Sequence, residues 1–202
     1  MDVERWENRY REGNLPWDTG TPDEHLIDIV ARHPIPPGRA LEIGCGTGTN
    51  AIWLATQGFR VTALDISTEA TAQARAKAKA AGAHCAFVAC DFVRNPPEQD
   101  NFAFAFDRGC LHSFDAAWDR ARFASNLAAL MADDGLWLSL IGSTDGPPRD
   151  SGPPRRSALD VVAAIEPHFE ILRLDAIFLR KDIDNPAQAW LCLSRKRREY
   201  AD

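Results

Sequence analysis

Short apolar runs alternate along the chain with longer segments in which apolar residues recur at helical spacing. Apolar runs bounded by turn residues are typical of strands buried on both faces of a parallel sheet. We predict parallel strands at 41–43, 61–65, 86–89, 102–106 and 136–141, and a closing antiparallel pair at 169–179 and 187–194.

The segments between these runs carry helix start and stop signals. Thr21 and the proline after it predict a helix that runs to about Arg32. Ser67 is a good cap for an alanine-rich helix, which Gly82 can end. Further helices are predicted at 51–57, 115–131 and 157–165. Alternating strands and helices predict an α/β fold with a mostly parallel sheet and helices on both faces.

A glycine-rich turn follows the first strand. Gly44, Gly46 and Gly48 stand at alternate positions behind the acidic residue Glu42. Glycine tolerates backbone angles that other residues resist, and it lets a ligand come close to the main chain. A dinucleotide fingerprint needs glycine at position 49, where this chain has Thr49. The turn therefore favours S-adenosylmethionine over NAD as the ligand.

Polar residues also follow the next three strands. Asp65 comes 21 residues after the first of these glycines, where a βαβ unit places a carboxylate that accepts both ribose hydroxyls. Asp91 and Phe92 follow the third strand, where they can accept the adenine amino group and pack on its ring. Arg108 and Gly109 follow the fourth strand and can contact the methionine end of the cofactor through main-chain groups.

These motifs, in this order, resemble the class I S-adenosylmethionine-dependent methyltransferases. The resemblance covers residues 39–141, and more loosely the rest. It implies a Rossmann-like fold with a seven-stranded, mostly parallel sheet whose last strand is antiparallel. It also implies S-adenosyl-L-methionine as cofactor, S-adenosyl-L-homocysteine as product, and a cofactor site made of Trp17, Glu42, Gly44, Cys45, Gly46, Gly48, Asn50, Asp65, Ile66, Asp91, Phe92, Arg108 and Gly109.

The N-terminal segment precedes the sheet and is free to fold over its ligand-binding edge. Its sequence Pro16-Trp17-Asp18-Thr19-Gly20 resembles a motif of the thiol and halide methyltransferases, within the wider thiopurine and tellurite-resistance group. The resemblance implies a lid in which Trp17 contacts the cofactor and water is excluded. For Trp6 and Tyr10 we favour a simpler role, in which they pack a helix onto the core.

Two residues are candidates for a catalytic role. His112 follows the fourth strand and can act as a base with a near-neutral pKa, although a capping or packed histidine is an equally good interpretation. Arg155 lies in a loop rich in proline and glycine, at 142–156, and can attract an anionic acceptor. A solvated loop is the alternative. The sequence Pro154-Arg155-Arg156-Ser157 also resembles the same small-acceptor enzymes, more loosely than the cofactor motifs do.

Composition narrows the range of partners. The net charge is −6 and charged residues make up 26% of the chain, so we expect neither nucleic acid nor a membrane as a partner. The five cysteines are odd in number and lack C-x-x-C spacing, which is typical of reduced thiols in a cytoplasm. Convergence of Cys45, Cys90 and Cys110 on a soft metalloid is a minor alternative, and no metal site is predicted.

We predict a single methyltransferase domain over residues 1–202. It comprises an N-terminal lid and helix (1–34), a cofactor-binding core (39–141), an active-site loop (142–156), and a C-terminal helix with a strand pair (157–195). The predicted reaction transfers a methyl group to a small acceptor, most simply a thiol or sulfide, with halides and chalcogen oxyanions as further candidates. The alternatives are a larger oxygen, nitrogen or sulfur acceptor, or a non-catalytic binding module. We expect a cytoplasmic monomer or homodimer.

Replacing Asp65 by alanine should remove most of the affinity for the cofactor while the fold is kept, because the ribose hydroxyls lose their acceptor. Calorimetric titration with S-adenosylhomocysteine measures the affinity, and circular dichroism reports the fold. Unchanged affinity would mean that the second strand has been misplaced.

Overall fold

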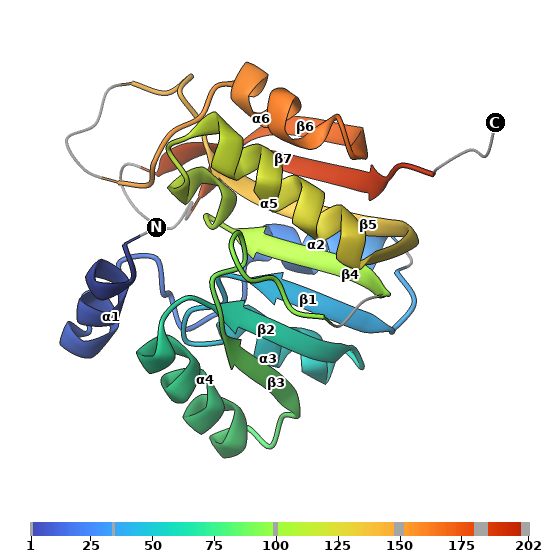
Figure 1. Cartoon of the computed structure of the whole chain (residues 1–202). Coiled ribbons are helices and arrows are strands. Elements are labelled where there is room, and N and C mark those ends of the chain that lie inside the picture. Colours follow the sequence, from blue (N-terminus) through green and yellow to red (C-terminus); the bar gives the residue numbers. More distant parts are fainter. Residues whose placement is uncertain (1, 34, 99–100, 148–151, 180–185, 199–202) are drawn as a thin grey trace.

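A single seven-stranded sheet organises the molecule, in the order β3-β2-β1-β4-β5-β7-β6 (Figure 1). The computed structural model describes residues 2–33, 35–98, 101–147, 152–179 and 186–198. The strands are β1 (Arg39–Ile43), β2 (Arg60–Asp65), β3 (Cys85–Ala89), β4 (Phe102–Arg108), β5 (Met131–Gly142), β6 (Phe169–Leu179) and β7 (Ala187–Lys196).

The strand directions confirm the predicted fold class. β1 pairs in parallel with β2 and β4, β2 with β3, and β4 with β5. β7 runs antiparallel to both of its neighbours, β5 and β6. The chain builds outward from β1 to β3 and then returns to the other side of β1 with β4. This reversal of strand order creates a crevice at the carboxyl ends of β1 and β4.

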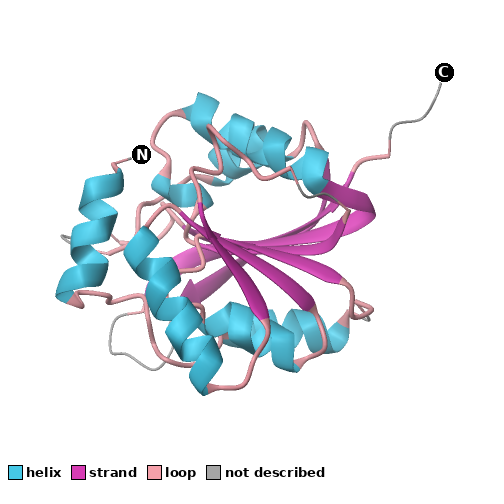
Figure 2. Ribbon diagram, turned by 60° about the horizontal axis from the view of Figure 1, so that its bottom comes forward, coloured by secondary structure: helices cyan, strands magenta, loops and turns pink. Residues whose placement is uncertain are grey.

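Helices cover both faces of the sheet (Figure 2). They are α1 (Val3–Glu12), α2 (Glu24–Arg32), α3 (Thr49–Thr56), α4 (Thr68–Ala80), α5 (Ala117–Leu130) and α6 (Ala158–Ile165), with a 3₁₀ turn η1 (Leu111–Ser113). None of these helices, in the part of the chain that the structure describes, is long and apolar enough to cross a membrane.

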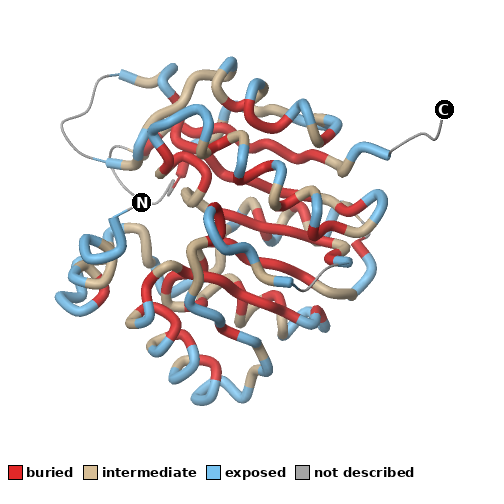
Figure 3. Tube along the Cα trace, in the orientation of Figure 1, coloured by how far each residue is buried: buried red, intermediate tan, exposed pale blue. Residues whose placement is uncertain are grey.

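The hydrophobic core lies in two layers because successive side chains of a strand point to opposite faces. Ala40 packs with apolar residues of α2 and α3 on one face. Leu41 and Ile43 pack with α5 and α6 on the other face. The central strands are buried along most of their length, whereas the outer surfaces of the helices are exposed (Figure 3).

An aromatic cluster fills the layer beneath α5. Phe123 of α5 packs on the indole of Trp137 in β5, with ring centroids 5.8 Å apart and planes at 26°. The indole Nε1 of Trp137 donates to Asp107 at 3.0 Å. The other oxygen of Asp107 accepts from the main-chain nitrogens of Cys110 and Leu111 at 3.2 and 3.1 Å. This buried carboxylate therefore joins the end of β4 to the core.

The structure corrects two predicted boundaries. The side chain that caps α2 belongs to Asp23, which accepts from the main chain of His25, and not to Thr21. β5 begins at Met131, five residues before the predicted start at Leu136. Asp134 has a φ of 62°, and the register with β4 shifts at this point. The turn signal in the sequence therefore produces a bulge inside the strand.

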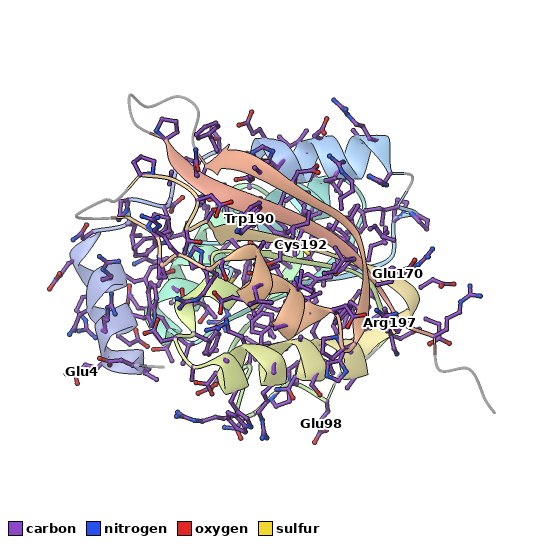
Figure 4. All side chains as sticks on the ribbon, turned by 90° about the horizontal axis from the view of Figure 1, so that it is seen from above. Glu4, Glu98, Glu170, Trp190, Cys192 and Arg197 are labelled. Atoms are coloured by element: carbon purple, nitrogen blue, oxygen red, sulfur yellow. The ribbon has the colours of Figure 1, made fainter. Side chains whose placement is uncertain are left out.

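Arginines near the C-terminus form ion pairs with acidic residues of neighbouring elements. Arg195 of β7 donates to Glu170 of β6 at 2.6 Å, and Arg197 pairs with Glu166 at the end of α6. Figure 4 shows Glu170 and Arg197 at the same end of this strand pair.

Truncating Phe123 to alanine should lower the free energy of unfolding by about 3–5 kcal/mol and the Tm by roughly 6–20 °C, because it opens a cavity beside Trp137. Trp118→Ala, on the same helix but 65% exposed, is the matched control and should change stability by less than about 0.5 kcal/mol. Thermal and urea denaturation measure both variants. Equal effects would contradict the assigned core.

Candidate cofactor site

A cleft of about 300 Å³ lies at the carboxyl ends of β1 and β4, where the strand order reverses. One wall is the glycine turn after β1, and the other is the segment between α1 and α2. The cleft is lined by Trp17, Asp18, Thr19, Thr21, Pro22, Asp23, Glu24, Glu42, Gly44, Cys45, Gly46, Thr47, Thr49, Asn50 and Arg108. Several of the residues predicted from the sequence thus meet at one site.

The glycine turn is sterically required in this fold. Gly44 has a φ of 72°, and a Cβ atom there would lie 2.8 Å from the Cβ atom of Cys110. Gly48 has a φ of 79°, and its Cβ atom would lie 2.9 Å from both Ala74 and Phe87. Neither position accepts a larger residue without displacement of its neighbours. Gly44 and Gly46 of this turn line the cleft.

Glu42 is the only carboxylate of the cleft that comes from the interior of a strand. It is 2% exposed, and its Oε1 accepts from Asn50 at 3.4 Å. Its Oε2 is buried without a hydrogen-bond partner within the described structure. Burial raises the pKa of Glu42 to about 8, against the opposing effect of the hydrogen bond from Asn50. A cationic donor placed in the cleft would satisfy Oε2 and favour the ionised carboxylate.

Asp65 stands at the end of β2, next to the glycine turn. Its two oxygens accept from the main-chain nitrogens of Gly46 at 2.9 Å and Ser67 at 3.0 Å. It is 7% exposed, and burial raises its pKa. Each carboxylate oxygen has a second lone pair, so the group retains the capacity to accept from a diol. Asp65 is not among the residues that line the cleft, and Tyr10 of α1 lies close enough for the charge of Asp65 to help raise the pKa of its hydroxyl.

The N-terminal segment, in which we predict the lid, contacts the glycine turn and contributes residues to the cleft. The ring of Trp17 packs edge-to-face with Trp6 at 5.5 Å and with Tyr10 at 6.1 Å. Asp18 accepts from the hydroxyls of Thr47 at 2.5 Å and Thr49 at 3.3 Å. The lid is therefore hydrogen-bonded directly to the glycine turn. Tyr10 is buried, as expected for a residue that packs α1 onto the core.

Arg108 ties the lid to the end of β4. Its Nε donates to Asp23 at 2.6 Å, and its Nη1 donates to the carbonyl of Trp17 at 3.2 Å. The side chain of Arg108 itself lines the cleft, whereas the sequence predicts a role there for its main chain. Asp23 in turn donates its main-chain N–H to Asn50 at 2.9 Å. Lid and core thus share one polar network.

The adenine end of the predicted site does not line the cleft. Asp91 accepts from the main chain of Val93 and Arg94 at 3.2 and 3.1 Å. Phe92 is buried in the core, with its ring 4.8 Å from that of Phe123. This packing argues against Phe92 as a side chain that stacks on adenine, because its ring already fills the layer beneath α5. Four further predicted residues also lie outside the cleft lining, namely Gly48, Asp65, Ile66 and Gly109.

His112 is buried beside the active-site loop. Its Nδ1 accepts from the main-chain nitrogen of Gly142 at 2.8 Å, which places the ring proton on Nε2. Burial, together with Arg156 and Arg108, lowers the pKa of His112 to about 3. The ring therefore stays neutral with its acceptor nitrogen engaged. This geometry argues against a proton-accepting role and favours the packed histidine that the sequence also allows.

Arg155 is occupied by the loop that carries it. Its guanidinium donates to the carbonyls of Ser143 at 3.0 Å, Thr144 at 2.6 Å, Gly146 at 2.8 Å and Pro147 at 3.1 Å. These bonds fold the first part of the loop around the side chain. An anionic acceptor would compete with four carbonyl groups for it. Arg155 is therefore best described as a residue that shapes the loop.

The other end of the loop is fixed by the sheet. The main chain of Arg156 donates to Gly142 at 2.8 Å, and the indole of Trp190 in β7 donates to the carbonyl of Arg156 at 3.0 Å. Trp190 is labelled in Figure 4. The middle of the predicted active-site loop, 148–151, lies outside the described residues.

The five cysteines are free thiols. Burial raises the pKa of Cys45, Cys90 and Cys110, and nearby carboxyl groups add to the effect. Thiols held in the protonated form are poor ligands for soft ions. Within the described ranges there is no group of three or more His, Cys, Asp or Glu residues that could hold a metal.

Some residues of the site were not predicted from the sequence. Asp23 and Thr47 join the lid to the core, and Glu7 binds α1 to the start of α4. The sequence predicted Thr21, and not Asp23, as the cap of α2, and nothing local to the sequence indicated these long-range partners.

Comparison with known proteins identifies the family. Residues 1–188 match the model of the thiopurine S-methyltransferase (TPMT) family, and the chain belongs to that family. The probable thiol methyltransferase 2 of Arabidopsis thaliana is 30% identical over 151 residues. The match covers 74% of this chain and 65% of that relative, so it spans less than two thirds of the plant protein.

Solved structures share the fold at lower identity. A structure reported as "Conversion of a Disulfide Bond into a Thioacetal Group during Echinomycin Biosynthesis" matches with a TM-score of 0.83 and 24% identity, over 96% of this chain and 91% of that one. The 1,6-didemethyltoxoflavin-N1-methyltransferase of Burkholderia thailandensis, solved with S-adenosylhomocysteine, gives a TM-score of 0.77 at 21% identity, over 96% and 86% of the two chains. At these identities the likeness concerns the fold alone.

Affinity for a ligand with an aminium group should rise with pH between about pH 6 and 7.5, by at most about tenfold per pH unit. The reason is that the free protein holds Glu42 protonated below its pKa of about 8, so binding that needs the carboxylate must release this proton. Titration of S-adenosylhomocysteine across this range measures the slope. Glu42→Gln should bind the ligand more weakly, and its affinity should lack the pH dependence that Glu42 contributes. Any pH dependence from other titrating groups should be the same in both proteins. Identical slopes in the two proteins would contradict a role for Glu42 in binding the aminium.

Proposed function

We propose that this protein transfers the methyl group of S-adenosylmethionine to a small nucleophilic acceptor, most simply a thiol or sulfide. The observation that carries the proposal is the cleft beside the glycine turn, in which the buried Oε2 of Glu42 has no partner among the described residues. Membership of the thiopurine S-methyltransferase family supports the same activity.

The charges of the cleft fit this cofactor. Four of its lining side chains carry carboxyl groups, namely those of Asp18, Asp23, Glu24 and Glu42, and Arg108 carries the one guanidinium among them. S-adenosylmethionine has a sulfonium, an aminium and one carboxylate, and therefore a net positive charge. A predominantly acidic cleft attracts such a ligand more strongly than it attracts an anionic nucleotide. Glu42 suits the aminium, and Arg108 suits the carboxylate of the ligand.

Each residue of the site then has a defined task. Glu42 binds the aminium group, and Asp65 accepts from the ribose hydroxyls. Gly44 and its neighbouring glycines let the cofactor approach the main chain. Trp17 closes the cleft and excludes water. The cofactor supplies an electrophilic methyl group, and the protein contributes alignment and a dry environment, which account for most of the acceleration in a displacement of this kind.

The protonation state of His112 indicates which class of acceptor the protein can methylate. Because its Nδ1 is engaged and its pKa is lowered to about 3, it does not draw a proton from the acceptor. A nucleophile that is partly ionised near neutral pH needs no such base, and thiols, with pKa values near 8.5, meet this condition better than alcohols do. The name of the Arabidopsis thaliana relative, a probable thiol methyltransferase, agrees with this choice.

The remaining assignments are parts of the same proposal. We place the whole reaction in one domain, with a lid at 1–34, a cofactor-binding core at 39–141, an acceptor loop at 142–156 and a closing unit at 157–195. Five free thiols suit a reducing cytoplasm. The acceptor is a small molecule, and the protein acts as a monomer or homodimer.

Incubation of the purified protein with S-adenosylmethionine and a panel of acceptors should yield S-adenosylhomocysteine with at least one sulfur acceptor, as measured by mass spectrometry. The panel contains hydrosulfide, methanethiol, an aromatic thiol, iodide, selenite and tellurite. The rate should rise with pH toward the pKa of the thiol, since the thiolate is the nucleophile. Cys110→Ser is a control that should retain activity toward every acceptor.

Two other outcomes have distinct meanings. Turnover only with larger oxygen or nitrogen acceptors would replace the thiol assignment and keep the methyltransferase activity. Binding of the cofactor without any turnover across the panel would contradict the small-acceptor proposal and favour a larger metabolite or a non-catalytic binding module.

A further inference from the structure

A carboxylate from the lid helix is inserted at the start of α4. Glu7 of α1 accepts four hydrogen bonds there, and its two oxygens share them evenly. Oε1 accepts from the main-chain nitrogen and the hydroxyl of Thr68 at 2.6 and 2.8 Å. Oε2 accepts from the hydroxyl of Ser67 at 2.9 Å and from the main-chain nitrogen of Glu69 at 3.1 Å.

This contact provides acceptors for main-chain N–H groups at the start of α4. The first main-chain N–H groups of a helix lack partners within the helix and carry partial positive charge. Ser67 caps α4 by accepting from Ala70, and Glu7 takes the donors of Thr68 and Glu69 that this cap leaves free. Desolvation opposes ionisation, yet these hydrogen bonds prevail and lower the pKa of Glu7 to about 2. Glu7 is therefore a carboxylate throughout the neutral range.

The other residues of α1 make few buried contacts with the rest of the protein. Tyr10 is its one buried residue among the ten of the helix, and most of the others are exposed (Figure 3). A second contact with α4 joins Gln73 to the carbonyl of Tyr10 at 3.1 Å. The helix lies beside α4 at the edge of the sheet, apart from the main body (Figure 1). Its position therefore depends on Glu7 and on the aromatic contacts of Tyr10.

The position of α1 determines where the lid aromatics stand. A Cβ atom on Gly46 would lie 3.0 Å from the Tyr10 hydroxyl, so the ring rests directly on the glycine turn. Burial raises the pKa of that hydroxyl, and the second cause is the charge of Asp65. Tyr10 also packs against Trp17. The helix thus places the ring of Tyr10, and through its packing that of Trp17, beside the turn and the carboxylate that the proposed function assigns to the cofactor.

We propose that Glu7 is a positioning residue for cofactor binding, which docks α1 on α4 and so holds Tyr10 and Trp17 over the Gly46 turn and Asp65. The proposal rests on the proposed function, because it assumes that the cofactor occupies this turn. Glu7 does not touch the cofactor. It acts through the lid, and its loss releases the lid from a core that remains folded.

The test compares wild type with Glu7→Ala, Glu7→Gln and Glu4→Gln. Glu4 belongs to the same helix, is exposed, and points away from the body of the molecule in Figure 4, so its variant has the charge change without the contact. Calorimetric titration with S-adenosylhomocysteine should give a Kd at least tenfold higher for Glu7→Ala. Glu7→Gln, which keeps one acceptor oxygen, should fall between Glu7→Ala and wild type. Glu4→Gln should match wild type within about twofold.

Hydrogen exchange separates positioning from general stability. In Glu7→Ala the amides of α1 should exchange faster, while those of β1, β4 and β5 keep their protection. With saturating cofactor and a thiol acceptor, kcat should stay within about threefold of wild type while KM for the cofactor rises. The ratio of the Kd of Glu7→Ala to the Kd of wild type should be constant from about pH 5 to 8. The reason is that the pKa of Glu7 is about 2, so its carboxylate stays ionised over this range.

The possible failures are distinguishable. If wild type binds no S-adenosylhomocysteine, the proposed function fails. If wild type binds it and Glu7→Ala binds equally well, or if α1 exchange is unchanged, the proposal for Glu7 fails and the proposed function stands. A uniform loss of protection across the sheet in Glu7→Ala, shared by Glu7→Gln, would also overturn it, because Glu7 would then support the fold as a whole.

Discussion

The site depends on one constraint, which is that β1 and β4 lie side by side while the chain leaves their carboxyl ends in different directions. From β1 the chain turns through Gly44 into α3, and from β4 it turns through Gly109 into η1. The two turns leave a crevice that no strand or helix fills. Close packing of Gly44 against Cys110 sets its inner wall. The lid then supplies the outer wall.

Buried carboxylates carry much of the polar character of this edge, and they divide into two kinds. Asp107 has partners for both of its oxygens, including the indole of Trp137 and the main chain of Leu111, so it serves the structure. Glu42 has a buried oxygen without a partner in the described structure. Its raised pKa means that ionising it costs stability, and this cost grows as the pH rises from its ordinary pKa toward about 8. A cationic ligand offsets that cost, which links binding to protonation.

The part of the lid that precedes α2 is fastened to the core by polar contacts at separate points, together with the packing of Tyr10. Glu7 reaches the start of α4, Asp18 reaches Thr47, and Asp23 pairs with Arg108. Such contacts are individually modest, so a segment held in this way can open locally without unfolding the sheet.

The sequence by itself determined the strands, most helices, the glycine turn and the carboxylates behind it, because each depends on local periodicity, capping or backbone freedom. It also indicated the family through Pro16-Trp17-Asp18 and the motif at 41–50. Only the tertiary structure decided which of the predicted side chains remain available to contact a cofactor or an acceptor. Phe92 packs in the core, while His112 and Arg155 are bound to main-chain groups of the loop. Glu7 joins residues that are 60 or more positions away. These roles depend on contacts between distant segments, which a local pattern does not encode.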